Sequence, residues 1–172
     1  MGEPIVEWLN QQQDNMVELL RDLVDIDSNS FDKAGVDRVG ARLTGFFDDN
    51  EIPHETIPLE EYGDAIRAVV SGGDGNQPIL LCGHRDTVFP TGEVEKRPFS
   101  IADGKAFGPG VADMKPGLVI NAFILAAFHK FGGHPNPLVG LFTGDEEIGS
   151  PASRDVITAE AEKARLAFNS EP

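Results

Sequence analysis

Histidine and acidic residues stand where several apolar segments of the sequence begin or end. The residues with this placement are His84, Asp86, Asp113, Asp145, Glu146, Glu147 and Glu171. Imidazole and carboxylate groups are ordinary zinc ligands, and a carboxylate between two ions can serve both of them. If the fold brings these side chains together, their types favour a site for divalent metal.

Each of these residues also has a simpler structural explanation. An isolated histidine such as His84 is more often a hydrogen-bonded structural residue than a ligand. Asp86 could form a turn with Thr87, and Asp113 could be the N-cap of a helix. The acidic run 145–147 alone is typical of a solvated patch near a helix start. The metal site is favoured because all of them fall at consecutive predicted strand ends or at one helix start.

The pattern of apolar residues predicts alternating strands and helices. Helices are expected over 5–26, 36–47, 114–131 and 153–163. Strands are expected over 52–59, 65–71, 79–83, 138–143 and 165–168, with a β-hairpin over 98–107. The helix 114–131 is apolar on nearly every side, which predicts deep burial. This order of elements predicts an α/β fold, with a largely parallel sheet and helices on both faces.

The predicted sheet would bring the candidate ligands to one rim. In sheets of this kind, ligands bind beyond the carboxyl ends of the strands, and His84, Glu147 and Glu171 all follow predicted strands. Several carboxylates held together without arginine repel one another unless a proton or a cation compensates them. A divalent metal ion supplies that compensation.

Composition limits the classes of function. With 14 basic and 29 acidic residues, the formal charge of the 172-residue chain is −15, which argues against partners such as nucleic acid and anionic membranes. The most apolar segment, 118–128, is interrupted by Asn121 and is too short to suggest a membrane span. The single cysteine, Cys82, excludes an internal disulfide and favours a cytoplasmic location.

Four segments together resemble a known family. They are GHRDTVFP at 83–90, FGPGVADMKPG at 107–117, TGDEEIGS at 143–150 and SEP at 170–172. In order and approximate spacing they resemble the zinc-dependent glutamate carboxypeptidases. That superfamily of metallopeptidases also includes aminoacylases, acetylornithine deacetylases and succinyl-diaminopimelate desuccinylases. The resemblance spans roughly residues 75–172 and implies a zinc peptidase-like catalytic domain.

The resemblance also implies two metal positions. His84 and Glu171 would bind the first ion, and Glu147 would bind the second. Asp113 would bridge the two ions. Zn²⁺ is the cofactor of the family, although a site rich in carboxylates also accepts Co²⁺ or Mn²⁺.

Two further residues acquire catalytic roles by the same resemblance. Glu146 would be the general base, and Asp86 would hold the His84 ring, because a ligating imidazole needs its other N–H fixed. The implied reaction is hydrolysis of an amide bond to release an amino acid, as in a carboxypeptidase or an N-acyl amino acid deacylase. The partner would be a small peptide or an N-acyl amino acid.

The sequence departs from the family pattern in several places. Members usually continue beyond the SEP motif into a lid or dimerisation domain and then supply a last histidine ligand. We therefore expect residues 1–172 to be an incomplete catalytic domain without the lid. His54, His129 and His134 do not occupy the position of that ligand, and Pro116 replaces a glycine usual in the family. The alternative function is a truncated, non-catalytic metal-binding fragment. An incomplete sheet would expose an unpaired edge, so we expect the chain either to be a fragment of a longer enzyme or to self-associate.

Overall fold

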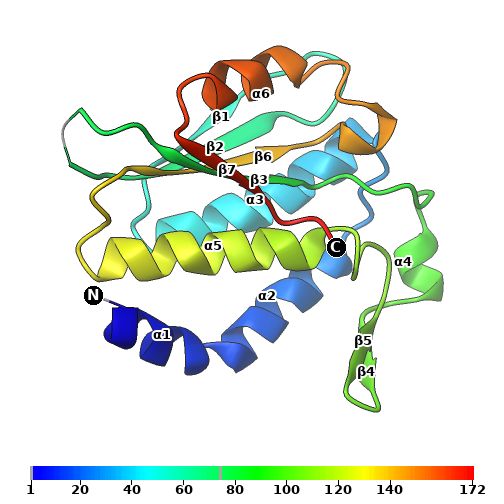
Figure 1. Ribbon diagram of the computed structural model, residues 1–172. Coiled ribbons are helices and arrows are strands. Elements are labelled where there is room, and N and C mark those ends of the chain that lie inside the picture. Colours follow the sequence, from blue (N-terminus) through cyan, green and yellow to red (C-terminus); the bar gives the residue numbers. More distant parts are fainter. Residues whose placement is uncertain (1, 74) are drawn as a thin grey trace.

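A central five-stranded sheet has helices on both faces (Figure 1). The computed structural model describes residues 2–73 and 75–172. The strand order in the sheet is β1-β2-β6-β3-β7. Its strands are β1 (His54–Ile57), β2 (Ala65–Val70), β3 (Ile79–His84), β6 (Leu138–Thr143) and β7 (Leu166–Asn169). The α/β fold class predicted from the sequence is confirmed.

Strand direction divides the sheet into two parts. β6, β3 and β7 run parallel to one another, whereas β1 and β2 add two antiparallel pairings beside β6. Every residue of β6 is buried, because the strand has neighbours on both edges and helices on both faces. The candidate site residues His84, Glu146 and Glu171 lie at or after the carboxyl ends of the parallel strands. These ends meet at one rim of the sheet.

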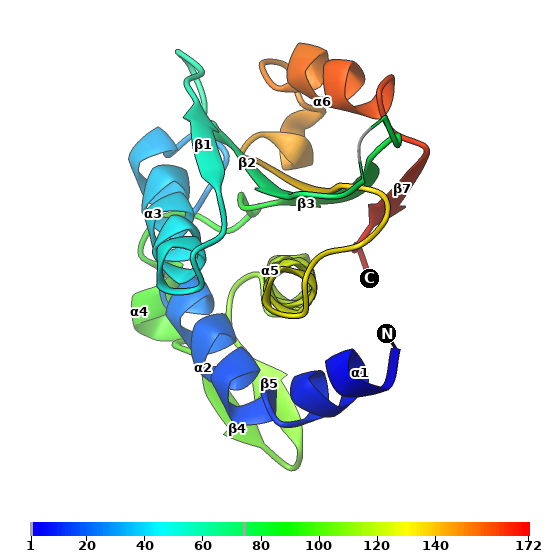
Figure 2. The same cartoon turned by 90° about the vertical axis from the view of Figure 1, so that its left-hand side faces the viewer.

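The helices form layers above and below the sheet (Figure 2). They are α1 (Gly2–Asn10), α2 (Gln13–Val24), α3 (Lys33–Asp49), α4 (Glu93–Lys96), α5 (Lys115–Lys130) and α6 (Arg154–Ala161). α6 covers one face, and α3 and α5 cover the other. α1 and α2 pack against α5 on the side away from the sheet. A helix that is apolar on nearly every side needs such cover on both sides.

Three details differ from the sequence prediction. The predicted helix 5–26 is two helices, α1 and α2, separated by a turn at Gln11 and Gln12. The sequence predicts helices on the two faces of the sheet, but α1 and α2 pack mainly on α5. The short helix α4 and the 3₁₀ turn η1 (Glu146–Ile148) were not predicted, because segments of three or four residues carry too little apolar periodicity. The predicted hairpin is present as β4 (Ser100–Ala102) and β5 (Lys105–Phe107).

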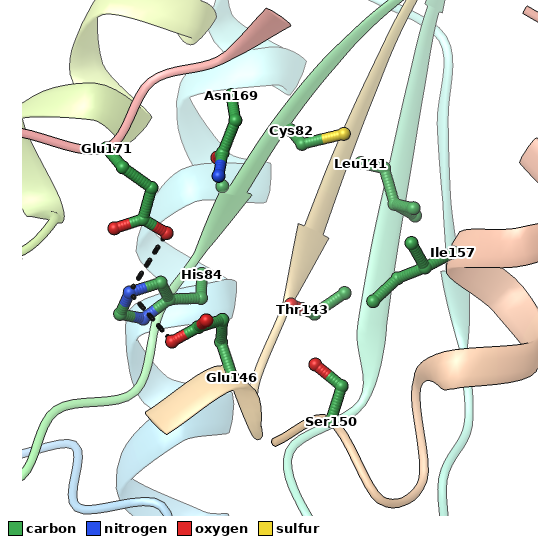
Figure 3. A pocket seen from close by; sticks show the side chains of 10 residues that line it. Cys82, His84, Leu141, Thr143, Glu146, Ser150, Ile157, Asn169 and Glu171 are labelled. Carbon is green, nitrogen blue, oxygen red and sulfur yellow. Dashed lines mark ion pairs between the residues drawn. The ribbon is translucent and has the colours of Figure 1, made fainter. Parts of the chain in front are cut away.

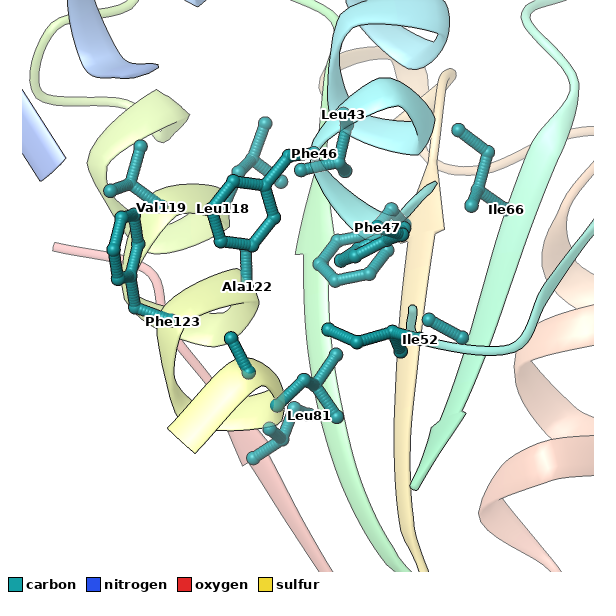
Figure 4. Close-up of a cluster of buried hydrophobic side chains, with 14 of the residues drawn as sticks. Leu43, Phe46, Phe47, Ile52, Ile66, Leu81, Leu118, Val119, Ala122 and Phe123 are labelled. Carbon is teal, nitrogen blue, oxygen red and sulfur yellow. The ribbon is translucent and has the colours of Figure 1, made fainter. Parts of the chain in front are cut away.

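The main hydrophobic core lies between α3, α5 and the sheet (Figure 4). Phe46 of α3 and Phe123 of α5 pack with ring centroids 4.9 Å apart, and Phe47 packs on Phe142 of β6 at 5.7 Å. Large aromatic contacts of this kind fix the distance between a helix layer and the sheet. Phe123 lies in the middle of α5, so these contacts fix α3 and α5 against each other and α3 against β6.

Within residues 2–73 and 75–172, none of the helices combines the length and the apolar character that crossing a membrane requires.

Candidate metal centre

The register of the parallel strands brings His84 and Glu171 to the same level of the sheet. Cys82 of β3 pairs with Asn169 of β7, and each chain then continues for two residues to its candidate ligand. His84 itself pairs with Thr143 at the end of β6, three residues before Glu146. Strand pairing alone therefore gathers three of the sequence-predicted site residues at one rim.

His84 is the centre of this cluster (Figure 3). Only 1% of the residue is exposed, and its Nε2 atom faces the solvent-accessible rim carboxylates. Nε2 lies 3.3 Å from Asp113 Oδ1, 3.5 Å from Glu171 Oε1 and 3.6 Å from Glu146 Oε2. One ring nitrogen thus faces three carboxylates from three different segments of the chain.

Asp86 holds the opposite side of the imidazole. His84 Nδ1 lies 3.0 Å from the backbone carbonyl oxygen of Asp86 and 3.3 Å from its carboxylate Oδ1. The same carboxylate accepts hydrogen bonds from the Ser30 hydroxyl at 2.7 Å and from the backbone N–H groups of Glu146 and Glu147 at 3.2 and 3.1 Å. Asp86 is fully buried. It therefore connects His84 to the acidic turn, the segment that contains Glu146 and Glu147, without contacting solvent.

The acidic triplet, residues 145–147, has side chains that point in two directions. Glu146 and Glu147 stand in the 3₁₀ turn at the rim, but the Asp145 side chain is fully buried and turned toward α6. Its carboxylate accepts hydrogen bonds from the backbone N–H groups of Ala152 and Ser153 at 2.7 and 3.0 Å, and from the Ser153 hydroxyl. Asp145 therefore lies outside the cluster that the sequence placed it in, and it instead satisfies amides at the start of α6.

Asp113 lies two residues before the first residue of α5, and about half of its side chain is exposed. The N-cap of α5 is Met114, so the simpler reading of Asp113 as a helix cap is wrong. The Asp113–Met114 peptide bond is cis. Pro116 is accommodated in the first turn of the helix.

A buried lysine that the sequence analysis did not single out anchors this segment. Lys115 is 1% exposed, and its ammonium group donates to the backbone carbonyls of Leu23 and Ile26, both at 2.8 Å. Burial lowers the pKa of Lys115 to about 7, although the charges of Asp27 and Asp25 act in the opposite direction. In the sequence, the feature that could have pointed to this role is the position of Lys115, two residues after Asp113 and at the start of an apolar helix.

The cluster is electrostatically unbalanced. Burial lowers the pKa of His84, but the hydrogen bond and charge of Asp86 and the charges of Glu171 and Glu146 outweigh that effect and raise it to about 9. Burial also raises the pKa values of Glu147 and Glu171, and neighbouring carboxylates raise them further. Across the described parts of the chain, no lysine or arginine forms a salt bridge with the rim carboxylates.

The donor set fits a divalent metal ion. Two groups have ligand atoms that all lie within 4.8 Å of one another, namely His84, Glu146 and Glu171, and His84, Asp113 and Glu147. One imidazole with oxygen donors suits zinc and similar ions, and a cation would relieve the repulsion that raises the glutamate pKa values. The first group contains Glu146, whereas the family resemblance implies a ligand at Asp113 in that place.

A cavity adjoins the cluster on the α6 side of the sheet (Figure 3). Its volume is about 260 Å³, and His84, Glu146 and Glu171 stand along its wall. Leu141 and Ile157 supply apolar surface to the same cavity. A small molecule could therefore reach the carboxylate cluster from this side.

Comparison with known proteins gives an independent line of evidence. The chain is 31% identical over 169 residues to carboxypeptidase G2 of Pseudomonas sp. (strain RS-16), an alignment that covers 94% of this chain and 39% of that protein. It is 32% identical over 165 residues to acetylornithine deacetylase of Salmonella arizonae (strain ATCC BAA-731 / CDC346-86 / RSK2980), covering 91% and 42%. The chain thus spans about two fifths of the length of these relatives.

Solved structures share the fold. The crystal structure of human carnosine dipeptidase 1 superposes with a TM-score of 0.83 at 18% identity, covering 100% of this chain and 41% of that one. Residues 80–172 match peptidase family M20/M25/M40, and this range includes all the rim residues described above. Because the match covers more than half of the sequence, the chain belongs to peptidase family M20/M25/M40.

Proposed function

We propose that the protein is a metal-dependent hydrolase that cleaves an amide bond to release an amino acid. The observation that carries this proposal is the position of His84 Nε2, within 3.3 to 3.6 Å of three carboxylates at a sheet rim. The relatives support the reaction class, since one is named a carboxypeptidase and another a deacetylase, and both kinds of enzyme hydrolyse amides. The substrate would be a small peptide or an N-acyl amino acid.

The side chains divide the work of this reaction. His84, Asp113, Glu147 and Glu171 would hold two zinc ions, with Asp113 between them. Bound divalent metal would polarise the substrate carbonyl and ease deprotonation of the attacking water. Glu146 would accept that proton on its carboxylate and later donate it to the leaving amine nitrogen. Asp86 would keep the Nδ1 side of His84 occupied, so that Nε2 faces the ligand cluster.

Metal loading and turnover test this proposal together. We would load the purified chain with Zn²⁺, Co²⁺ or Mn²⁺, determine the metal content by elemental analysis, and assay a panel of N-acyl amino acids and dipeptides. Glu146→Gln should abolish turnover and retain metal, whereas His84→Ala should weaken metal binding itself. A wild-type chain that retains none of the three ions would overturn the proposal.

A second candidate is a metal-binding chain without turnover. The observation that favours it is that both ligand groups share His84, so one imidazole serves two sets of donors. By the family resemblance, the second metal position has no histidine of its own among residues 1–172. One bound ion per chain without hydrolysis would support this candidate, and two ions with turnover would exclude it.

Self-association through the sheet edge is also part of the proposal. In the described chain β7 pairs with β3 on one side only, and its Leu166 and Phe168 are 52% and 54% exposed. Unpaired edge strands with apolar side chains favour pairing with another chain. Light scattering across a range of concentrations would test this, and a strictly monomeric protein would contradict it. A cytoplasmic location is proposed on the single free cysteine, Cys82.

A further inference from the structure

Asn121 interrupts the apolar surface of α5 at a fully buried position. The side-chain amide donates from Nδ2 to the backbone carbonyl of Cys82 at 2.9 Å and accepts at Oδ1 from the Ser170 hydroxyl at 2.8 Å. Cys82 precedes His84 by two residues, and Ser170 precedes Glu171 by one. A single amide therefore contacts both chain segments that deliver metal-ligand candidates.

Backbone hydrogen bonds alone hold the segment after β7 only weakly against β3. The N–H of Ser170 reaches the Cys82 carbonyl at 3.4 Å, which is long for an amide hydrogen bond. The stronger bond to the same carbonyl comes from Asn121. The segment after β7 thus depends on the helix for its position at the level where it turns toward His84.

A second residue of α5 fits the same segment. A Cβ atom added at Gly117, one helical turn before Asn121, would lie 2.3 Å from the backbone oxygen of Ser170. The absence of a side chain at 117 lets Ser170 approach the helix, and the amide at 121 then binds it. Close approach and hydrogen bonding act on the same residue, next to Glu171.

From these contacts we propose that Asn121 is a positioning residue that holds Glu171 against His84 in the geometry needed to bind divalent metal. The proposal rests on the metal-dependent function proposed above. It assigns to Asn121 no contact with metal or substrate. Its effect passes through Ser170, and it sets the placement of the Glu171 carboxylate, now 3.5 Å from the imidazole.

The test compares Co²⁺ affinity and the visible absorption spectrum of bound Co²⁺ among variants of the whole chain. Asn121→Leu keeps a similar volume and removes both hydrogen bonds, and it should weaken Co²⁺ binding by roughly 10- to 100-fold and alter the spectrum. Ser170→Ala should weaken binding in the same direction, and the double variant should be no worse than Asn121→Leu. Chelator competition gives the affinities, and thermal unfolding of the metal-free chain reports folding separately.

Two further variants separate positioning from general destabilisation. Val119→Ala truncates a buried residue of the same helix, so it should lower the unfolding temperature and leave Co²⁺ affinity unchanged. In a Glu171→Gln background, Asn121→Leu should have no additional effect on affinity, because its effect requires that carboxylate. Loss of affinity in Val119→Ala, or an undiminished effect of Asn121→Leu in the Glu171→Gln background, would overturn the positioning role.

The outcomes also distinguish this proposal from the proposed function. A wild-type chain that binds no Co²⁺, Zn²⁺ or Mn²⁺ overturns both. A wild-type chain that binds Co²⁺ as tightly as Asn121→Leu overturns the positioning role alone. If Asn121→Leu is too unstable to purify, Ser170→Ala and its combination with Glu171→Gln carry the same test.

Discussion

The Asp86 carboxylate accepts a hydrogen bond from the backbone N–H of Glu147 at 3.1 Å, although the two residues lie 61 positions apart. Its other oxygen lies 3.3 Å from His84 Nδ1. Burial disfavours the charged carboxylate, but its bonds to His84 and Ser30 outweigh that effect and lower the pKa of Asp86. A single ionised group thus fixes both the histidine and the acidic turn.

Asp86→Asn should weaken metal binding much more than it weakens the fold. The carboxamide has only one accepting oxygen, so it cannot serve both the His84 ring and the N–H groups of Glu146 and Glu147. Changes to groups that orient a ligating histidine typically cost about 10- to 100-fold in metal affinity. Competition with a chelator of known affinity would measure the loss.

The same substitution at Asp32 provides the control. Asp32 is the N-cap of α3 and accepts from the Gly35 N–H at 3.0 Å. Asparagine is an equally good N-cap, so Asp32→Asn should change neither stability nor metal affinity appreciably. Equal losses of affinity in the two variants would show that the effect of Asp86→Asn is not specific to the cluster.

Gly117→Ala should displace the segment that carries Glu171. The new methyl group would lie 2.3 Å from the Ser170 backbone oxygen and 2.5 Å from the Met114 side chain, so the chain must move. Overpacking of this kind typically costs about 1–3 kcal/mol of unfolding free energy. We expect loss of that order in urea denaturation, together with weaker metal binding.

Gly45→Ala is the matched control on another helix. A Cβ atom at Gly45, inside α3, would meet no atom within 4 Å. There the helix propensity of alanine should add about 0.5–1 kcal/mol of stability and leave metal binding unchanged. A higher unfolding free energy for Gly117→Ala, or a lower one for Gly45→Ala, would contradict this packing.

Metal affinity should rise with pH between pH 6.5 and about 9, because the pKa of His84 in the metal-free chain is raised from 6.5 to about 9. A metal ion must displace the proton on the imidazole, so protons compete with metal throughout that window. The raised pKa also means that protonated His84 stabilises the metal-free fold below pH 6.5, and this contribution is lost as the pH rises through about 9.

Calorimetry in buffers with different ionisation enthalpies would measure the protons released on metal binding. We expect release of about one proton per chain from His84 in this window. The unfolding temperature should respond more to added Zn²⁺ at the alkaline end of the window than at the acidic end. A metal affinity that does not change across the window would contradict the assignment of His84 as a ligand.

Strand ends could be predicted from the sequence, and side-chain direction within a short turn could not. The run 138–143 is continuously apolar because β6 is buried on both faces, and its end therefore places the acidic triplet at the rim. The same pattern does not reveal that η1 turns Asp145 inward while Glu146 remains half exposed. Direction there depends on the amides that α6 offers, and those come from residues later in the chain.

The roles of Lys115 and Asn121 show the same distinction. Both are polar residues in the mostly apolar helix α5, and both donate to backbone carbonyls far away in the sequence. A backbone acceptor leaves no trace in residue type, so only the packed structure identifies it. The fold class and the ligand candidates followed from local patterns, whereas the contacts that position them required the tertiary structure.

Substitutions in the acidic triplet test whether Asp145 points into the fold and Glu147 points to the rim. Asp145→Ala should lower the unfolding free energy by about 1–3 kcal/mol, because it leaves the buried N–H of Ser153 and the part-buried N–H of Ala152 without their acceptor. Its metal affinity should remain close to that of the wild type. Glu147→Gln should show the opposite pattern, since its pKa is raised by burial and by neighbouring carboxylates. Removing its charge relieves repulsion in the metal-free chain and deletes a ligand.

Urea denaturation without metal and chelator competition with Zn²⁺ would measure the two properties separately for both variants. The expected result is a crossed pattern, in which Asp145→Ala loses stability and Glu147→Gln loses affinity. If Asp145→Ala lost metal while Glu147→Gln kept it, the inward and outward directions of these carboxylates would have to be exchanged. That result would also contradict the structural role of Asp86. Its carboxylate accepts from the backbone N–H of Glu147 and so fixes the turn that places Glu147 at the rim.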